Sequence, residues 1–165
     1  MKRTAALAAL LGITMLAPAV SGADETASLA VSATVTNNCT ISTAPLAFSA
    51  YDPVVANASN NLDGTGHVSV ACTKGASPTI GLGNGSGASG SVRRMSDGAG
   101  NFLSYDLYQD SGRSLSWANG GSNLLTTTAA TSKAARDFTV YGRIAGNQDV
   151  PAGSYADTIV ATVNF

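Results

Sequence analysis

The chain ends on the stretch Tyr155-Ala-Asp-Thr-Ile-Val-Ala-Thr-Val-Asn-Phe165, in which apolar side chains recur at every second position. The recurring set is Ile159, Ala161, Val163 and Phe165. A period of two residues predicts a β-strand that packs on one face. Because a long apolar strand at a sheet edge pairs readily with another chain, we expect an unfinished sheet at this end.

A second alternating segment, Thr26-Ala-Ser-Leu-Ala-Val-Ser-Ala-Thr-Val35, precedes the first cysteine. Its apolar set is Ala27, Leu29, Val31, Ala33 and Val35. A free strand near one end of the chain and an unfinished sheet at the other are what strand donation requires, since an extended segment of one chain then completes the sheet of another. The two segments together predict a subunit that polymerises in this way.

The first residues have the features of a secretory signal. Residues 1–23 combine a basic start, a short apolar run and small residues, and the run is too short to span a membrane. Cleavage after Ala23 is favoured, and cleavage after Ala19 is the alternative. We therefore expect an exported protein in which residues 24–37 form the donor segment and residues 38–165 form one domain.

The composition excludes several classes of partner. Charged residues make up 12% of the chain and its net charge is −1, which is too little positive charge for nucleic acid. Ser, Thr, Gly, Asn and Ala dominate the sequence, which favours strands and loops over helices. We expect no cofactor.

Two cysteines, Cys39 and Cys72, lie 33 positions apart in a chain with an export signal. In an oxidising compartment the default prediction is one disulfide bond. In the chain-entropy model such a bond stabilises the fold by roughly 3–4 kcal/mol. We expect no metal site, because these thiols have a single histidine in the whole chain to assist them.

Strand-like runs recur between clusters of Gly, Asn and Asp, and no alternation of strands with helices is evident. The expected strands are His67–Cys72, Pro78–Leu82, Val92–Met95, Phe102–Tyr108 and a run through Phe138, Val140 and Ile144. The turn at residues 97–101 predicts a hairpin, residues 57–66 are expected to form a polar loop, and residues 126–136 loop and strand. The class is therefore all-β, and an open terminal edge favours a sandwich over a closed barrel.

The candidate catalytic residues do not form a recognised constellation. His67 has no Ser, Cys or carboxylate motif beside it, so a structural role is favoured. Asp106 and Asp110 flank Tyr108 but are expected on solvated positions. The glycine-rich run 83–88 lacks the helix that a dinucleotide site needs. We therefore do not expect an enzyme.

Trp117 leaves two interpretations open. With Tyr108 and Arg113 near it in the sequence, it could line a carbohydrate or surface-adhesion patch. It could equally pack at the end of the core, and the core is the favoured prediction because a tryptophan buries a large apolar area.

Several short motifs, taken in order, resemble the spore coat protein U domain family, the subunits of archaic (Csu-type) chaperone–usher pili. They are Cys39-Thr-Ile41, Leu46-Ala-Phe48, Tyr51-Asp-Pro53, Val68-Ser-Val-Ala-Cys-Thr73, Arg94-Met95, Leu103-Ser-Tyr-Asp-Leu-Tyr-Gln-Asp110, Trp117, Tyr141-Gly-Arg143 and Val150-Pro-Ala-Gly-Ser-Tyr-Ala-Asp157. The resemblance runs from Cys39 to Phe165. Ala118 departs from it, since family members often carry glycine there.

The resemblance implies an incomplete immunoglobulin-like sandwich that lacks its final strand. A periplasmic chaperone lends a strand until an outer-membrane usher exchanges it for the N-terminal segment of the next subunit. The implied donor side chains are Ala27, Leu29, Val31, Ala33 and Val35, and the implied acceptor groove is lined partly by Ile159, Ala161, Val163 and Phe165.

The leading hypothesis is thus a subunit of a surface pilus that supports adhesion and biofilm formation. A spore- or cell-coat protein of the same family and a secreted adhesin module are the alternatives. Tip adhesins of this kind need a receptor domain before the pilin domain and no donor strand, which argues against the adhesin. The sequence leaves open whether the subunit is a major shaft component or a minor adaptor.

Overall fold

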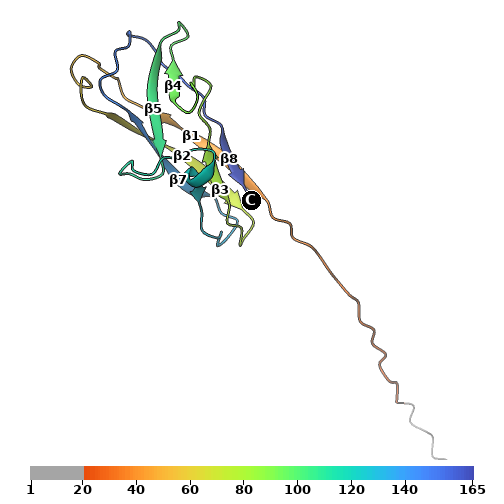
Figure 1. Ribbon diagram of the computed structural model, residues 1–165. Coiled ribbons are helices and arrows are strands. Elements are labelled where there is room, and N and C mark those ends of the chain that lie inside the picture. The colour runs from red at the N-terminus through yellow and green to blue at the C-terminus, as the bar shows by residue number, and fades with distance from the viewer. Residues whose placement is uncertain (1–20) are drawn as a thin grey trace, which may run out of the picture. The chain divides into compact units, whose positions relative to one another are not determined.

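The computed structural model describes residues 21–165, and in this part of the chain the regular structure is almost entirely β (Figure 1). The strands are β1 (Cys39–Ala47), β2 (Leu62–Cys72), β3 (Thr79–Leu82), β4 (Arg93–Ser96), β5 (Phe102–Tyr108), β6 (Leu125–Thr126), β7 (Arg136–Ile144) and β8 (Ala161–Asn164), and η1 (Gly121–Asn123) is a short 3₁₀ helix. The predicted all-β class is confirmed.

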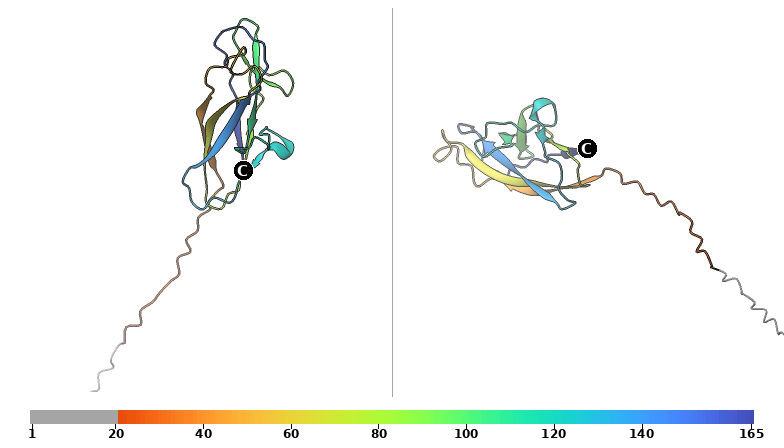
Figure 2. Two further views of the ribbon diagram at one scale, coloured as in Figure 1. Left: turned by 90° about the vertical axis from the view of Figure 1, so that its left-hand side faces the viewer. Right: turned by 90° about the horizontal axis from the view of Figure 1, so that it is seen from below.

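The strands form two antiparallel sheets. One sheet has the order β1-β2-β7-β5-β4, and the other has the order β6-β3-β8. β5 pairs with β7 through three residue pairs only, residues 106–108 with residues 141–143. Figure 2 shows β1, β2 and β7 forming one layer, with β3 across from them. The core between the layers draws on both sheets.

The long strand β2 holds the centre of the larger sheet between β1 and β7. Its C-terminal half is the predicted strand, and Val68, Val70 and Cys72 are buried on its core face. The prediction of a loop over residues 57–66 is wrong in its second half, since β2 already begins at Leu62. Polar and glycine residues form a strand here because β7 pairs with them along the ladder.

Trp117 lies in the core with no exposed surface. Its indole Nε1–H donates to the carbonyl of Ile80 at 2.9 Å, which satisfies its one polar group. Arg93 lies beside it and donates to the carbonyl oxygens of Leu82, Gly83 and Trp117 itself. The structure therefore confirms the core interpretation of Trp117.

Cys39 and Cys72 form a disulfide bond, as predicted. They are directly opposite in the β1–β2 ladder, at the first residue of one strand and the last residue of the other. The neighbouring residues continue the connection, because Thr73 N donates to the Asn38 carbonyl at 2.9 Å and Asn38 N donates to Thr73 Oγ1 at 3.1 Å. The first residue of β1 is therefore covalently bonded to the last residue of β2.

The C-terminal stretch forms a shorter strand than the alternation predicts. Only Ala161–Asn164 pairs as β8, and residues 155–160 are held by isolated contacts. Gly83 N donates to the Val160 carbonyl at 2.9 Å, and Ser86 N donates to that of Thr158 at 3.2 Å. The physical reason is the partner: β3 ends at Leu82, so no continuous strand remains for the earlier residues.

The N-terminal residues of the described range behave differently. Residues 21–38 have no regular secondary structure and are exposed, so the alternating segment 26–35 forms no strand in the single chain. The expected export signal lies for the most part in residues 1–20, outside the described residues.

Candidate functional site

A groove of about 780 Å³ lies in the sandwich domain between two sheet edges. One edge is β1, which ends the larger sheet, and the other is β8 with residues 155–160 before it, which ends the smaller sheet. Within residues 35–165 neither edge has a strand partner on its outer side. We call this hollow the groove throughout.

The floor of the groove is apolar and belongs to the core. Buried side chains from four strands form it: Val68, Leu82, Leu103, Leu107, Val140 and Ile144. One wall is the second half of β1, including Leu46, followed by Phe48, and the other wall includes Tyr155 and Ile159. Such a surface favours an apolar occupant, because each buried apolar side chain contributes about 1.5–3 kcal/mol when it leaves water.

Glycines allow the β1 wall to approach the sheet. A Cβ at Gly66 would lie 2.8 Å from Leu46 Cβ, and one at Gly142 would lie 2.7 Å from Phe48 Cζ. Both are closer than a real side chain can approach. Leu46 and Phe48 therefore pack over a strip of β2 and β7 that carries no side chains, and they still line the groove.

The groove is closed at one end and open at the other. Its lining on β1 begins at Thr43 and on β8 includes only Ala161, and the two strands are in contact with each other. The closed end therefore lies toward the disulfide. At the open end the lining includes Tyr51, Pro53 and the turn 150–153. We call this open end the mouth.

Asp157 fixes the C-terminal wall to its surroundings. Its Oδ1 accepts hydrogen bonds from Ser86 Oγ at 2.8 Å and Gly87 N at 3.0 Å, and its Oδ2 accepts one from Tyr105 Oη at 2.7 Å. Burial works to raise the pKa of Asp157, but these donors outweigh it and hold the pKa below its usual value. Gly85 makes the approach possible, since a Cβ there would collide with the carboxylate.

Tyr105 is the neutral partner of this carboxylate. Burial raises its pKa well above the usual range, and the hydrogen bond to Asp157 raises it further. The phenol therefore stays protonated and donates at any physiological pH. One carboxylate thus joins the groove wall to β5 and to the loop after β3.

Tyr51 and Gln148 fix the mouth. Tyr51 Oη donates to the Ala145 carbonyl at 3.1 Å and accepts from Gln148 N at 2.9 Å. The Gln148 side chain pairs with the backbone of Ser104 in both directions, at 2.8 Å and 3.0 Å. The side-chain amide of Gln148 thus pairs with β5 as the backbone of a neighbouring strand would. These hydrogen bonds fix the residues around the mouth.

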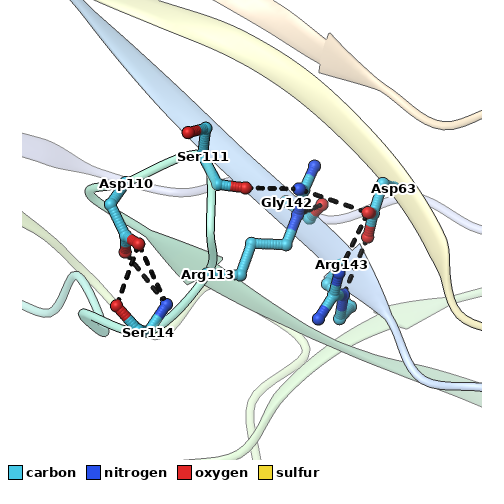
Figure 3. A network of polar contacts seen from close by, with 7 residues as sticks. All are labelled: Asp63, Asp110, Ser111, Arg113, Ser114, Gly142 and Arg143. Carbon is cyan, nitrogen blue, oxygen red and sulfur yellow. Dashed lines mark hydrogen bonds and ion pairs between the residues drawn. The ribbon is translucent and has the colours of Figure 1, made fainter.

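A second polar cluster holds the loop after β5 and lies outside the groove lining (Figure 3). Asp63 makes a bidentate pair with Arg143, at 2.8 and 3.0 Å, and a further ion pair with Arg113 at 3.2 Å. The hydrogen bond from Arg143 is the main cause that lowers the pKa of Asp63. Asp110 accepts from the backbone and hydroxyl of Ser114, so it shapes the turn. Asp106 is exposed, as expected, whereas Asp110 is half-buried and hydrogen-bonded within its turn.

The structure separates the predicted acceptor residues into two pairs. Ile159 and Ala161 line the groove. Val163 pairs opposite Ile80 and packs against the core, and Phe165 is 58% exposed; neither belongs to the lining. Among residues 21–165 the donor candidates Leu29, Val31 and Val35 are the most exposed large apolar side chains, at 82–88%. Ala27 and Ala33 are exposed with them.

Sequence reasoning missed the β1 wall and the polar frame. Leu46, Phe48, Tyr51 and Asp157 appear in the motifs but were given no role, and Gln148 was given none. The one local signal was glycine inside strands, at Gly66 and Gly142, which marks a close approach of another segment.

The candidate histidine and the possibility of a metal site remain to be described. His67 is exposed on β2. Residues 21–165 contain no group of three or more His, Cys, Asp or Glu side chains that could hold a metal ion. In the same range we find no helix with the length and apolar character of a membrane span.

Comparison with known proteins places this domain among relatives. The family model described as Spore Coat Protein U domain matches residues 25–162. Protein U of Myxococcus xanthus is 37% identical over 174 residues, covering 98% of this chain and 96% of that protein.

A chain in the crystal structure of the CsuC–CsuE chaperone–tip adhesion subunit pre-assembly complex, from archaic chaperone-usher Csu pili of Acinetobacter baumannii, shares the fold. The TM-score is 0.58 at 22% identity, over 80% of this chain and 41% of that one. The likeness supports the immunoglobulin-like class, and this chain spans less than half of the other's length. The family match over most of the sequence shows that the chain belongs to the Spore Coat Protein U domain family.

Proposed function

We propose that the protein is a structural subunit of a surface pilus, assembled by strand donation. The apolar groove between two unpaired sheet edges carries this proposal. In the assembled form, residues 24–37 of one copy lie in the groove of another copy or of a neighbouring subunit. The donated strand completes an immunoglobulin-like sandwich, and the donated backbone pairs with an open edge.

The dimensions of the two parts agree. The groove wall runs from Tyr155 to Ala161, which spans about 20–23 Å at about 3.3 Å per residue. A strand of this length directs three or four side chains to one face. We therefore place Leu29, Val31 and Ala33 in the groove. Ala27 and Val35 flank them at its two ends.

The exposed groove explains the partners of the assembly. A subunit with an unfilled apolar groove aggregates, so a periplasmic chaperone that lends a strand protects it before export. An outer-membrane usher then exchanges that strand for the donor segment of the next subunit. Adhesion and biofilm formation are the cellular roles that such fibres serve. The subunit acts without catalysis, metal or cofactor.

A test compares Val31→Asp with Ser32→Asp in surface extracts analysed on unboiled denaturing gels. A buried, unpaired carboxylate is strongly unfavourable, so Val31→Asp removes the detergent-resistant ladder. Ser32 lies on the other face of the same segment, and its substitution leaves the ladder intact. A wild-type protein that runs only as a monomer, or equal loss in both variants, contradicts the proposal.

A coat protein is the second candidate, since the family model carries the spore coat description and Protein U is a relative over almost the whole chain. The same groove and donor segment serve either architecture. Electron microscopy of the producing cells separates the two, because a pilus gives thin fibres and a coat gives a continuous layer.

A further inference from the structure

The two ends of the sandwich domain carry opposite charge. The mouth end presents three carboxylates from separate loops: Asp52 after β1, Asp97 between β4 and β5, and Asp149 after β7. All three loops lie at the end where β1 and β7 finish and β5 begins. Two cations lie near them: Arg94, with its guanidinium 4.0 Å from the centre of the Phe102 ring, and Arg143, which is paired with Asp63. The carboxylates outnumber the cations, so this end carries an excess of negative charge.

The opposite end, which we call the disulfide end, is basic. Lys74 follows β2 and Lys133 precedes β7, and they are the only lysines among the described residues. Gly75 N donates to the Ala130 carbonyl at 2.8 Å, which brings the two loops together. Arg136 adds a third positive charge, and the next residue, Asp137, places a carboxylate beside it.

Internal hydrogen bonds fix two of the acidic loops. Asp52 accepts hydrogen bonds from the backbone N–H groups of Val54 and Val55, at 2.9 and 3.1 Å. Asp97 accepts from Asn101 in the same way, through its backbone and its side chain. These donors lower the pKa of both carboxyls, so they stay ionised down to acidic pH.

An apolar pair stands beside the mouth. Val54 and Val55 are 80% and 75% exposed, and Pro53 before them lines the groove. Exposed valines held on a rigid turn next to a charged rim have the composition of a contact surface. Within the domain they pack against nothing that would explain their position.

The connection between the donor segment and its own domain determines which surface of that domain lies next to the mouth end. Residues 36–38 enter the domain at the disulfide end, where Thr73 Oγ1 donates to the Thr36 carbonyl. If a donor strand fills the groove, its chain leaves through the mouth, because the other end is closed by β1 and β8. Three residues lie between Val35 and Cys39, so the two are four residue steps apart and the donating domain lies within about 14 Å of the mouth.

We propose that the disulfide end of a second copy docks on the mouth end, with Lys74 and Lys133 against the acidic loops and the valine pair in the contact. This surface rests on the proposed strand donation but adds to it a second, head-to-tail contact between domains. It makes each junction directional through charge complementarity, which also steers the approach of the next subunit.

Cysteine trapping tests the contact in assembled fibres of the mature chain. Val55→Cys combined with Lys133→Cys is expected to give a covalent ladder on boiled, non-reducing gels after mild oxidation. Either substitution alone gives at most dimers, since a ladder needs both partners on every copy. Asp106→Cys with Lys133→Cys is the matched control, because Asp106 is exposed on β5 and belongs neither to the acidic loops nor to the valine pair.

Unboiled, reduced samples of the same fibres report strand donation separately. A non-covalent ladder with no covalent ladder beyond the control overturns the docking surface and leaves strand donation standing. Absence of the non-covalent ladder in wild type overturns both.

Charge reversal provides a second readout without new thiols. Asp149→Lys or Lys133→Glu alone is expected to accelerate junction dissociation several-fold at low salt, and the combined variant restores the wild-type rate. If the dissociation rate of the combined variant is instead raised by the two single effects together, the result contradicts the proposal.

Discussion

The two alternating segments of this chain share a pattern and differ in every physical property. Val31, at the centre of residues 26–35, is 87% exposed and lies in no strand. Ile159 and Val163, in the C-terminal stretch, pack against the core. The difference is that β3 and the loop after it provide hydrogen-bond partners for one segment. No strand within residues 21–165 pairs with residues 26–35.

An alternating pattern therefore shows which side chains a segment is able to bury. Whether they are buried depends on an unpaired sheet edge with which the segment can pair. The groove supplies such an edge, but the segment that fits it belongs to another copy in our proposal. Within one chain the sequence thus holds both a packed strand and an unpaired one.

The largest expected effect concerns the boundary between the two regions, at Cys39. Replacing both cysteines by serine lowers the free energy of unfolding by about 3–4 kcal/mol, because the unfolded chain loses a 33-residue constraint. Urea unfolding followed by the fluorescence of Trp117, the only tryptophan, measures this. The double replacement Ser42→Ala and Ser69→Ala, one cross-strand pair of the same ladder, is the control. A loss of unfolding free energy below about 1 kcal/mol would show that the disulfide bond contributes little to the stability of the domain.

A smaller effect separates the two faces of the C-terminal segment. Ile159→Ala removes a half-buried side chain from the groove wall and is expected to cost about 1–3 kcal/mol. Val160→Ala, at a side chain that is 68% exposed, is expected to change stability by less than about 0.5 kcal/mol. The same urea experiment compares them. Equal effects contradict the view that this segment is packed on one face.

The smallest expected effect concerns the polar anchor of the wall. Asp157→Asn replaces an ionised acceptor and is expected to cost about 1–2 kcal/mol at pH 7. Because the pKa of Asp157 is lowered in the fold, its contribution is present above the usual range near 4 and is lost as the pH falls through the folded-state pKa.

Unfolding measured from pH 7 down to pH 2 therefore shows the wild-type and Asp157→Asn curves converging at low pH. Asp106→Asn, at an exposed carboxylate of β5, is the control and stays close to wild type throughout. A constant gap between wild type and Asp157→Asn at all pH values would contradict the role of the charge.

Local patterns predicted those features that depend on local chemistry. Alternation located β5 and its buried face of Leu103, Tyr105 and Leu107, and turn residues located the hairpin to β4. The cysteine pair and the burial of Trp117 also followed from residue type and compartment. In each case a few neighbouring residues, or one covalent bond, are enough to predict the feature.

Non-local pairing decided the rest. Residues 62–66 carry no strand pattern, yet they form the start of β2 because β7 lies beside them. Leu46 and Phe48 became a groove wall because glycines on β2 and β7 leave room for them. The groove itself exists because two sheets stop at facing edges, and no single stretch of sequence specifies that meeting.

The sequence by itself determined the all-β class, the disulfide, the core tryptophan and two segments able to pair on one face. Only the tertiary structure decided that one segment is packed while the other stays free, and that an apolar groove with an acidic mouth lies between β1 and residues 155–161. The physical reason is that side-chain periodicity is encoded locally, whereas hydrogen-bond partners and burial depend on which edges the whole fold brings together.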